Sequence, residues 1–308
     1  MTSKLRVAVI GVGHLGRHHA RILGHLEDVQ LVAVADSKPG RAEEIGAPLG
    51  ARAVQDFTDL VGQVDAVTIA VPTERHADVA VPFLERGIPV LVEKPLARTL
   101  AEADRIISAA CASGATLAVG HTERHNPAVR AASTIVTDPR FIEVHRLGTF
   151  PERSLDIDVV FDLMIHDLDV VLALVRSEVE AIDSVGVPVL TDRVDIANAR
   201  LRFANGCIAN LTASRISRDR VRKIRFFQPD TYVSIDYAEQ EVEVYRLVRG
   251  GAPRPNIEGG QLAVVHEEPL RHEMVDFISA VRTGSTPAVT GEDGRRALVV
   301  AARIVEKM

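Results

Sequence analysis

Residues 11–16 read GVGHLG, and this stretch decides the fold because it matches the pattern G-x-G-x-x-G. The apolar residues 6–10 before it predict a short buried strand, and residues 17–26 after it predict a helix. A second apolar strand over residues 30–35 ends at Asp36, twenty residues beyond the last glycine. This order of strand, glycine turn, helix, strand and acidic residue indicates a dinucleotide-binding unit of the Rossmann type.

Each glycine of such a turn has a physical role. Gly11 permits the tight turn, Gly13 lets the backbone approach the pyrophosphate, and Gly16 lets helix and strand pack closely. The free N–H groups and the dipole of the helix N-terminus stabilise the phosphate charge. We therefore predict cofactor contacts at Gly11, Gly13, His14, Leu15 and Gly16. The alternative is a structural glycine turn in an unrelated α/β protein.

Asp36 discriminates between the two nicotinamide dinucleotides. Its carboxylate can accept hydrogen bonds from both ribose hydroxyls of NAD and would repel the additional phosphate of NADP. Ser37 and Lys38 follow it and can accommodate a phosphate. We predict NAD as the cofactor, with NADP as the alternative.

Three histidines near the glycine turn, His14, His18 and His19, resemble a metal cluster at first sight. No nearby carboxylate or cysteine completes a ligand set. We therefore expect these histidines on the helix surface or beside the phosphates, without a metal.

The first part of the chain alternates short apolar strands with helices. Beyond Asp36, strands are expected at residues 65–70, 89–92 and 116–119, and helices at residues 77–86 and 100–113. This alternation predicts an α/β fold with a parallel, doubly wound sheet. We assign residues 1–120 to an NAD-binding Rossmann domain.

The pattern changes after residue 120, where segments that alternate polar and apolar residues predominate. Residues 181–248 contain several of them, and Asn205-Gly206 between two predicts a β-hairpin. The other predicted elements are helices at 126–136, 159–175, 271–282 and 292–307, a strand at 141–150, and a Gly/Pro-rich loop at 250–260. We expect residues 121–308 to form an α+β domain with a large, mostly antiparallel open sheet.

Composition argues against several classes of protein. The net charge is −6, aromatic residues make up 4% and Trp is absent, so neither a basic surface nor a stacking platform for nucleic acid is expected. Cys111 and Cys207 lack the spacing of metal ligands and predict no disulfide scaffold, which fits a reducing cytoplasm. The N-terminus does not read as a signal peptide, and no apolar run could span a membrane. We expect a cytoplasmic protein without nucleic-acid or membrane partners.

Two further strand ends carry candidate site residues, because ligands of open α/β sheets bind at the carboxyl ends of the strands. Pro72 and Thr73 follow one strand and His76 begins the next helix, which predicts either a turn with a helix cap or a contact to the nicotinamide. Glu93 and Lys94 end another strand, and the proline that follows holds Lys94 extended. Lys94 could there donate a hydrogen bond to a substrate oxygen. The alternative is a surface lysine in a loop.

A stripe of titratable groups marks the apolar helix predicted over residues 159–175. Asp162, His166 and Asp169 fall at i, i+4 and i+7, so they share one face of an α-helix, and Asp158 extends the stripe. Such groups on a buried helix are costly unless they are partnered or used. The stripe therefore predicts a catalytic site. The alternatives are a satisfied core histidine and a metal site, and we expect no metal.

These motifs together resemble the glucose–fructose oxidoreductase/inositol dehydrogenase (Gfo/Idh/MocA) family. The resemblance rests on residues 11–16, 71–76, 93–95, 162–166 and 271–307. It implies a Rossmann domain followed by a substrate-binding domain with a large open sheet, through which homodimers or homotetramers form. It also implies a catalytic lysine, here Lys94, with Asp162 and His166 opposite the nicotinamide, and cofactor contacts that include Pro72, Thr73, His76, Glu93 and Lys94.

Residues 119–128 resemble the version of this family found in UDP-N-acetylglucosamine 3-dehydrogenase-like members. Those members commonly carry Phe before the Asn-Pro pair, where this sequence has His125. The departure leaves the substrate open among sugars, nucleotide sugars and cyclitols.

The resulting hypothesis is NAD-dependent oxidation of a ring hydroxyl. His166 would remove the hydroxyl proton, Lys94 would stabilise charge on the same oxygen, and Asp162 would orient the site. The roles of Lys94 and His166 could be exchanged. Two alternatives remain, an NAD-dependent glycosidase that oxidises transiently and a non-catalytic NAD-binding regulator.

Overall fold

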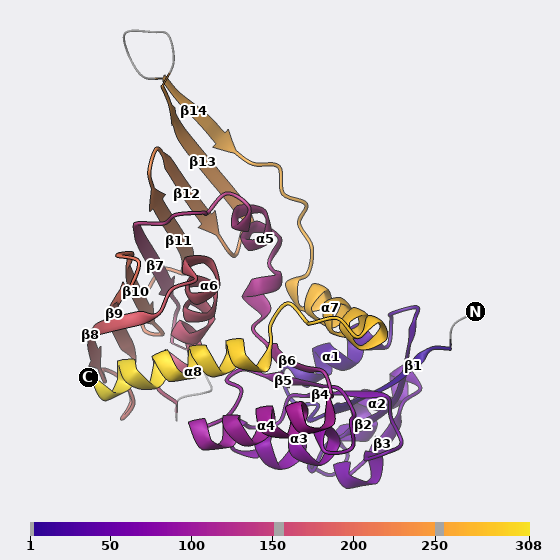
Figure 1. Ribbon diagram of the computed structural model, residues 1–308. Helices are drawn as coiled ribbons and strands as arrows, with labels where there is room; N and C mark the ends of the chain where they lie inside the picture. The colour runs from indigo at the N-terminus through magenta and orange to yellow at the C-terminus, as the bar shows by residue number, and fades with distance from the viewer. Residues whose placement is uncertain (1–2, 151–156, 250–255) are drawn as a thin grey trace. The chain divides into compact units, whose positions relative to one another are not determined.

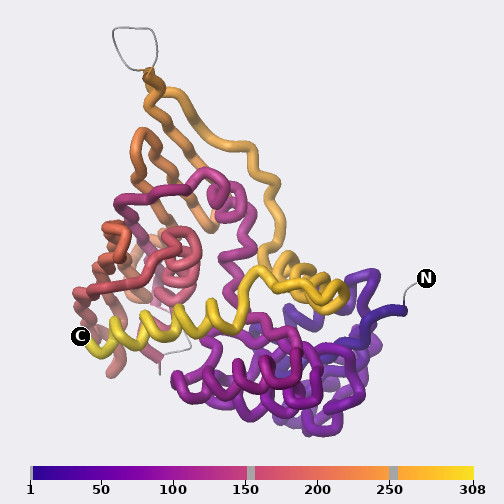
Figure 2. The backbone as a smooth tube through the Cα atoms, viewed as in Figure 1, coloured from indigo at the N-terminus to yellow at the C-terminus, as the bar shows by residue number. Residues whose placement is uncertain are grey.

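The computed structural model describes residues 3–150, 157–249 and 256–308, and the chain divides into two compact units. The first unit contains Met1–His121 and Leu270–Arg295, and the second contains Thr122–Pro269 and Arg296–Met308. The sequence had placed residues 270–295 in the second domain. Figures 1 and 2 trace the chain through both units.

The sheet of the first unit has six strands in the order β3-β2-β1-β4-β5-β6 (Figure 1). All its neighbouring strands pair in parallel. The strands are β1 (Leu5–Ile10), β2 (Val29–Ala35), β3 (Arg52–Val54), β4 (Ala66–Ile69), β5 (Val90–Glu93) and β6 (Leu117–Gly120). This is the doubly wound order of a Rossmann fold, so the predicted fold class is confirmed for this unit. The short edge strand β3 was not predicted.

Helices cover both faces of this sheet. They are α1 (Gly16–Leu23), α2 (Arg41–Gly46), α3 (His76–Leu84), α4 (Leu100–Ser113) and α7 (Pro269–Thr283), with short turns η1 (Ala47–Leu49), η2 (Phe57–Leu60) and η3 (Thr73–Arg75). Figure 1 shows α1 and α7 on one face and α3 and α4 on the other. The predicted bounds of α4 are confirmed, since Thr99 and Glu102 form a capping box at its start and Gly114 ends it in the left-handed conformation.

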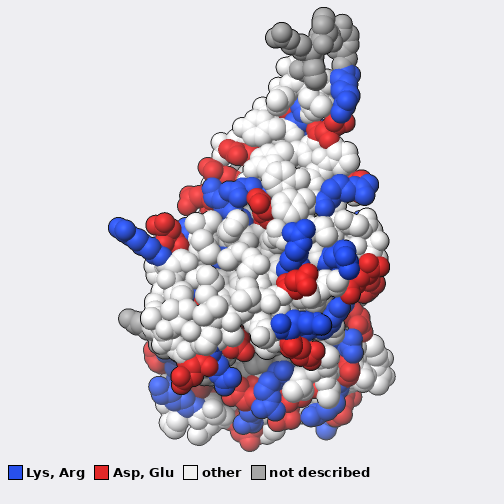
Figure 3. All heavy atoms as spheres, turned by 90° about the vertical axis from the view of Figure 1, so that its left-hand side faces the viewer, with Lys and Arg blue, Asp and Glu red and all other residues white. Residues whose placement is uncertain are grey.

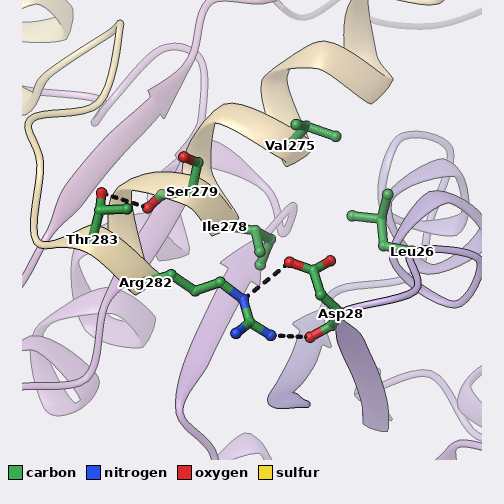
Figure 4. Close-up of a pocket in the computed structure, with 7 residues that line it drawn as sticks. All are labelled: Leu26, Asp28, Val275, Ile278, Ser279, Arg282 and Thr283. Atoms are coloured by element: carbon green, nitrogen blue, oxygen red, sulfur yellow. Dashed lines mark hydrogen bonds and ion pairs between the residues drawn. The ribbon is translucent and has the colours of Figure 1, made fainter. Parts of the chain in front are cut away.

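Apolar packing explains why the late segment Leu270–Arg295 belongs to the first unit. Met274, Phe277 and Ile278 of α7 are buried in the same core as α1 and the sheet. An ion pair of 3.0 Å joins Arg282 Nε to Asp28 Oδ2, just before β2. Figure 4 shows this pair beside a shallow hollow of about 170 Å³, which is lined by Leu26, Asp28, Val275, Ile278, Ser279, Arg282 and Thr283.

The second unit is built on an eight-stranded sheet in the order β14-β13-β12-β11-β7-β10-β9-β8. Its strands are β7 (Phe141–Leu147), β8 (Val179–Val187), β9 (Ile196–Phe203), β10 (Ile208–Ser214), β11 (Val221–Gln228), β12 (Thr231–Asp236), β13 (Glu241–Val248) and β14 (Asn256–Gln261). Only the β7–β10 pair is parallel among these strands. The predicted mostly antiparallel sheet is therefore confirmed, as is the hairpin at Asn205-Gly206, where Gly206 adopts a φ of +84°.

Helices cover one face of this sheet, and no helix among the described residues covers the other. The helical segments are η4 (Thr122–His125), α5 (Pro127–Ser133), η5 (Val160–Met164), α6 (Ile165–Val175) and α8 (Gly291–Glu306), the last of which begins in the first unit. Alternate strand residues such as Leu201, Leu211 and Phe226 are buried in one core with these helices. The intervening residues, such as Thr212 and Arg225, remain partly exposed.

The loop predicted over residues 250–260 is wrong in its second half. Residues 250–255 lie outside the described residues, whereas Asn256–Gln261 forms β14 and pairs with β13. A Cβ at Gly259 would collide with the carbonyl oxygen of Val244 and lie 2.8 Å from the Cα of Tyr245. Gly259, one of the glycines that predicted a loop, thus permits close approach between two strands.

Candidate active site

The glycine turn between β1 and α1 has the shape that a dinucleotide requires. Gly11 has a φ of +82°, and a Cβ there would lie 2.8 Å from the carbonyl oxygen of Ala70. A Cβ at Gly16 would collide with the carbonyl oxygen of Gly11. At the exposed Gly13, by contrast, a Cβ would meet nothing within 4 Å. The turn is therefore held by tight packing on one side and is open at Gly13, where a diphosphate could approach the backbone.

The N-terminus of α1 follows directly after this open turn. Its N-cap residue, Leu15, makes no side-chain capping bond, and its side chain is 40% exposed, like its exposed neighbour His14. The dipole of the helix favours an anion close to its N-terminus. The residues present thus fit a dinucleotide pyrophosphate.

Asp36 lies at the end of β2 and helps to shape the turn. Its Oδ2 accepts a hydrogen bond of 3.0 Å from the N–H of Val12, and its Oδ1 accepts one of 2.9 Å from the N–H of Lys38. Each carboxylate oxygen has a second lone pair, so these bonds leave acceptor capacity for ribose hydroxyls.

Arg41 is a residue of this site that the sequence analysis missed. Its Nε donates to the carbonyl oxygen of Val12 at 2.9 Å, and its Nη1 pairs with Glu44 Oε2 at 2.7 Å. The signal was an arginine five residues beyond Asp36, but the short helix α2 that carries it was not predicted. A second cation besides Lys38 thus lies close to the turn.

Pro72 and Thr73 begin the η3 turn after β4, where Pro72 is exposed and Thr73 half-buried. His76 is buried, and its ring lies between carbonyl oxygens, with Nε2 3.0 Å from Val71 O and Nδ1 3.0 Å from Pro95 O. Burial lowers the pKa of His76, while these carbonyl groups act in the opposite direction. In its described contacts, His76 neither caps a helix nor lies on the surface. These contacts hold the loops after β4 and β5 together.

Lys94 stands at the carboxyl end of β5 and is half-buried, directly after the buried Glu93. Glu93 Oε2 accepts a hydrogen bond of 3.1 Å from the N–H of Lys94, and Glu93 Oε1 lies 3.0 Å from His19 Nε2. The expectation that His19 lies on the helix surface or beside the phosphates is wrong. His19 is fully buried, because α1 packs this side of its surface on the sheet.

The predicted stripe on the second unit's apolar helix is only partly regular. Residues 160–164 form a π-helical turn, so Asp162 does not stand in α-helical register with His166 at the start of α6. Both residues are half-buried. The two residues at the ends of the stripe make structural contacts. Asp169 pairs with Arg124 at 3.5 Å, and Asp158 accepts a hydrogen bond of 3.0 Å from the N–H of Val194.

A buried ion-pair network beside His166 was not foreseen. Arg146 binds Asp167 through two bonds of 2.6 and 2.9 Å and binds Glu123 at 3.0 Å, and its guanidinium lies 5.1 Å from the centre of the Tyr237 ring. Although burial lowers the pKa of Arg146, the carboxylates of Asp167 and Glu123 raise it above its ordinary value. The network fixes the first turn of α6, which carries His166.

Comparison with known proteins decides the family. Residues 5–121 match the oxidoreductase family with an NAD-binding Rossmann fold, and residues 129–233 match the GFO/IDH/MocA C-terminal domain. The chain belongs to this family. The predicted family and the predicted cofactor, NAD, are therefore confirmed, and this GFO/IDH/MocA protein is an NAD-dependent dehydrogenase.

Relatives within the GFO/IDH/MocA family are similar over almost their whole length. UDP-N-acetylglucosamine 3-dehydrogenase of Acidithiobacillus ferrooxidans is 38% identical over 302 residues, which cover 97% of this chain and 96% of that one. A solved structure of that enzyme aligns with a TM-score of 0.94 at 37% identity, over 100% of this chain and 98% of the other. Myo-inositol 2-dehydrogenase of Thermotoga maritima is 27% identical over an alignment of 320 residues, which covers 96% of this chain and 94% of that one.

Two other features of the described residues bear on the site. His19, Glu93 and Glu273 are the one group of metal-ligand types found there, with ligand atoms within 4.8 Å of one another. No helix in the described ranges is both long and apolar enough to cross a membrane.

Proposed function

We propose that this dehydrogenase oxidises a ring hydroxyl of a nucleotide sugar of the UDP-N-acetylglucosamine type, with NAD as hydride acceptor. The observation that carries the proposal is the 38% identity to UDP-N-acetylglucosamine 3-dehydrogenase over 97% of this chain. The inositol dehydrogenase of Thermotoga maritima covers as much of the chain at only 27% identity. A cyclitol is therefore the second candidate substrate.

The first unit would hold the cofactor. The open turn at Gly13 and the start of α1, with Gly11, His14, Leu15 and Gly16, would bind the pyrophosphate, and Asp36 would accept the ribose hydroxyls. Pro72, Thr73, Glu93 and Lys94 would border the nicotinamide, with His76 holding their loops in place. NAD supplies the hydride acceptor when bound.

Three side chains would act on the substrate. His166 would accept the hydroxyl proton, because an imidazole titrates near neutral pH. Lys94 would donate a hydrogen bond to the same oxygen and stabilise its developing charge. Asp162, on the π-helical turn before His166, would orient the ring. The buried Arg146–Asp167 pair supports this assignment, since it fixes the turn that carries His166.

A substrate panel tests the proposed function. The purified protein is mixed with NAD and, separately, UDP-N-acetylglucosamine, other UDP-sugars, free sugars and myo-inositol, and the absorbance of reduced nicotinamide is followed. We expect the highest kcat/KM with UDP-N-acetylglucosamine. A higher kcat/KM with myo-inositol would reject the nucleotide sugar, and turnover without net reduced nicotinamide would favour the glycosidase.

We also propose that the chain assembles as a homodimer or homotetramer through the open face of the eight-stranded sheet. Four aromatic residues line up across this face, with ring centres 5.6, 5.3 and 6.3 Å apart in the order Phe141, Phe227, Tyr232 and Tyr245. Tyr245 is 41% exposed, although it belongs to a strand in the sheet. Figure 3 shows a broad area with few charged side chains on the face it presents. A row of partly exposed aromatic residues is typical of an interface.

A further inference from the structure

We propose that His19 is a positioning residue for Lys94, acting through Glu93, and that Glu273 belongs to the same cluster of buried side chains. The inference rests on the proposed catalytic role of Lys94. We call His19, Thr68, Glu93 and Glu273 the His19 cluster, and all four are buried within the first unit.

His19 is held from both sides of its ring. Nε2 lies 3.0 Å from Glu93 Oε1, and Nδ1 lies 3.3 Å from the hydroxyl oxygen of Thr68. The carboxylate can only accept, so Nε2 carries the proton and donates to Glu93. The imidazole of α1 is thus bonded to side chains from β5 and β4.

Glu93 passes this constraint on to Lys94. Its other oxygen accepts the 3.1 Å hydrogen bond from the N–H of Lys94. Gly120 on the neighbouring strand leaves little room, because a Cβ there would lie 3.0 Å from the carboxyl carbon of Glu93. The Glu93 carboxylate thus has one hydrogen-bond donor on each oxygen and lies close to Gly120. It therefore fixes the direction in which the Lys94 backbone leaves the strand.

Glu273 adds a third element to the cluster. It stands on α7 and is 1% exposed, and its carboxylate lies within 4.8 Å of the ligand atoms of His19 and Glu93. Burying two carboxylates beside one imidazole costs more desolvation free energy than packing apolar side chains there. A cost of this kind, in a cluster that includes the hydrogen-bond partner of the Lys94 N–H, is typical of a site where charge and geometry serve the chemistry.

The cluster connects the proposed cofactor site with the proposed catalytic lysine. His19 is three residues beyond Gly16, so the same short helix presents its N-terminus to the cofactor and its buried side to the support of Lys94. Removing the Nε2 donor should therefore displace Lys94 while leaving the exposed glycine turn unchanged. Turnover, and not dinucleotide binding, should suffer.

A hydrogen-bonded cluster accounts for these residues better than a metal site. The 3.0 Å separation of His19 Nε2 and Glu93 Oε1 is the length of an N–H···O bond, and the second oxygen of Glu93 already accepts from Lys94. A metal bound by this cluster would have to displace at least the first of these bonds.

The test compares His19→Gln with His19→Leu. A glutamine amide nitrogen can replace the Nε2 donor, whereas leucine removes it. We expect His19→Leu to lower kcat by about 30-fold, because displacement of a reacting group by about 1 Å can cost about 100-fold. The Kd for NADH, measured by fluorescence titration, should stay within about threefold of wild type, and His19→Gln should recover most of the lost kcat. The exposed His25→Leu serves as the matched control.

Several results would overturn the inference. Unchanged kcat in His19→Leu would do so, as would equal losses of kcat in both variants accompanied by equal losses of thermal stability. If the wild-type protein contains a stoichiometric divalent metal that His19→Gln lacks, the cluster is a metal site and the inference is rejected. Lys94→Ala is assayed in parallel, since its retained turnover would reject the proposed function itself and not only the role of His19.

Discussion

The carboxylate of Asp36 binds the backbone N–H of Val12 at 3.0 Å, so the residue expected to recognise the ribose also holds the glycine turn. Arg41 donates to the carbonyl oxygen of the same Val12 at 2.9 Å. One residue of the turn is therefore fixed on both sides, by an anion and by a cation. This arrangement leads to a prediction about cofactor choice.

Asp36→Ser should move the preference from NAD towards NADP. Serine no longer repels a ribose phosphate, and Arg41 and Lys38 can then pair with that phosphate. We expect kcat/KM for NAD to fall about 10-fold or more and that for NADP to rise. Steady-state kinetics with both cofactors measure the change. The double variant Asp36→Ser/Arg41→Ala should lose the gain with NADP, and a gain that persists would exclude Arg41 from the effect.

Lys94→Ala should abolish turnover and preserve NAD binding. The side chain would stabilise charge only as it develops on the substrate oxygen, whereas the pyrophosphate is held by the turn before α1. We expect kcat below about one hundredth of the wild-type value, with the Kd for NADH within about threefold. Retained turnover above that level would remove Lys94 from the mechanism.

Arg146→Met should strongly destabilise the second unit. It leaves the buried carboxylates of Asp167 and Glu123 without the guanidinium, and breaking such a buried pair costs about 3–5 kcal/mol. Arg225→Met is the matched control, because its 3.5 Å pair with Glu143 on the open sheet face is about one third exposed and contributes about 1 kcal/mol at most. Urea unfolding followed by circular dichroism compares the two. Equal shifts of the unfolding midpoint would contradict the assigned importance of burial.

Asp195 should make the stability of the second unit sensitive to acid. Burial raises the pKa of Asp195, but three backbone N–H donors and the Arg215 guanidinium hold it well below its ordinary value. A carboxyl group whose pKa is depressed on folding stabilises the folded state above its unfolded pKa, about 3.9, and this contribution is lost as pH falls through the folded pKa.

Thermal unfolding of the wild type and of Asp195→Asn tests that sign. The difference in Tm should be largest between about pH 5 and pH 8 and should shrink steadily below about pH 4. A difference that stays constant down to about pH 3 would show that ionisation of Asp195 contributes nothing.

Tyr245→Glu should dissociate the proposed oligomer, because it introduces a charge at the exposed end of the aromatic row on the open sheet face. Size-exclusion chromatography with light scattering reports the mass. Val265→Glu, at an exposed apolar position outside the sheet strands, should leave the mass unchanged. An assembly that tolerates Tyr245→Glu would place the interface elsewhere.

The features that the sequence determined by itself are those with local causes. The turn at residues 11–16 is specified by Gly11, which has a positive φ, and by Gly16, where a larger residue would collide with the carbonyl oxygen of Gly11. The helix Leu100–Ser113 is bounded by its own capping box and by Gly114. Alternation of apolar residues likewise specified which face of β9 and β10 is buried, because a strand has a fixed period of two.

Tertiary structure decided what depends on residues far apart in the chain. His19 is buried because the sheet, β5 and α7 surround it, and Arg146 finds its carboxylates on η4 and α6. Residues 256–261 form a strand because Gly259 allows close approach to β13, although their composition predicts a loop. Asp36 shows both contributions. The sequence alone identified it as a candidate for ribose recognition, but its hydrogen bond from Val12 forms only because the fold brings the end of β2 beside the glycine turn. Burial and pairing of polar groups are set by neighbours in space, and a linear pattern does not encode those neighbours.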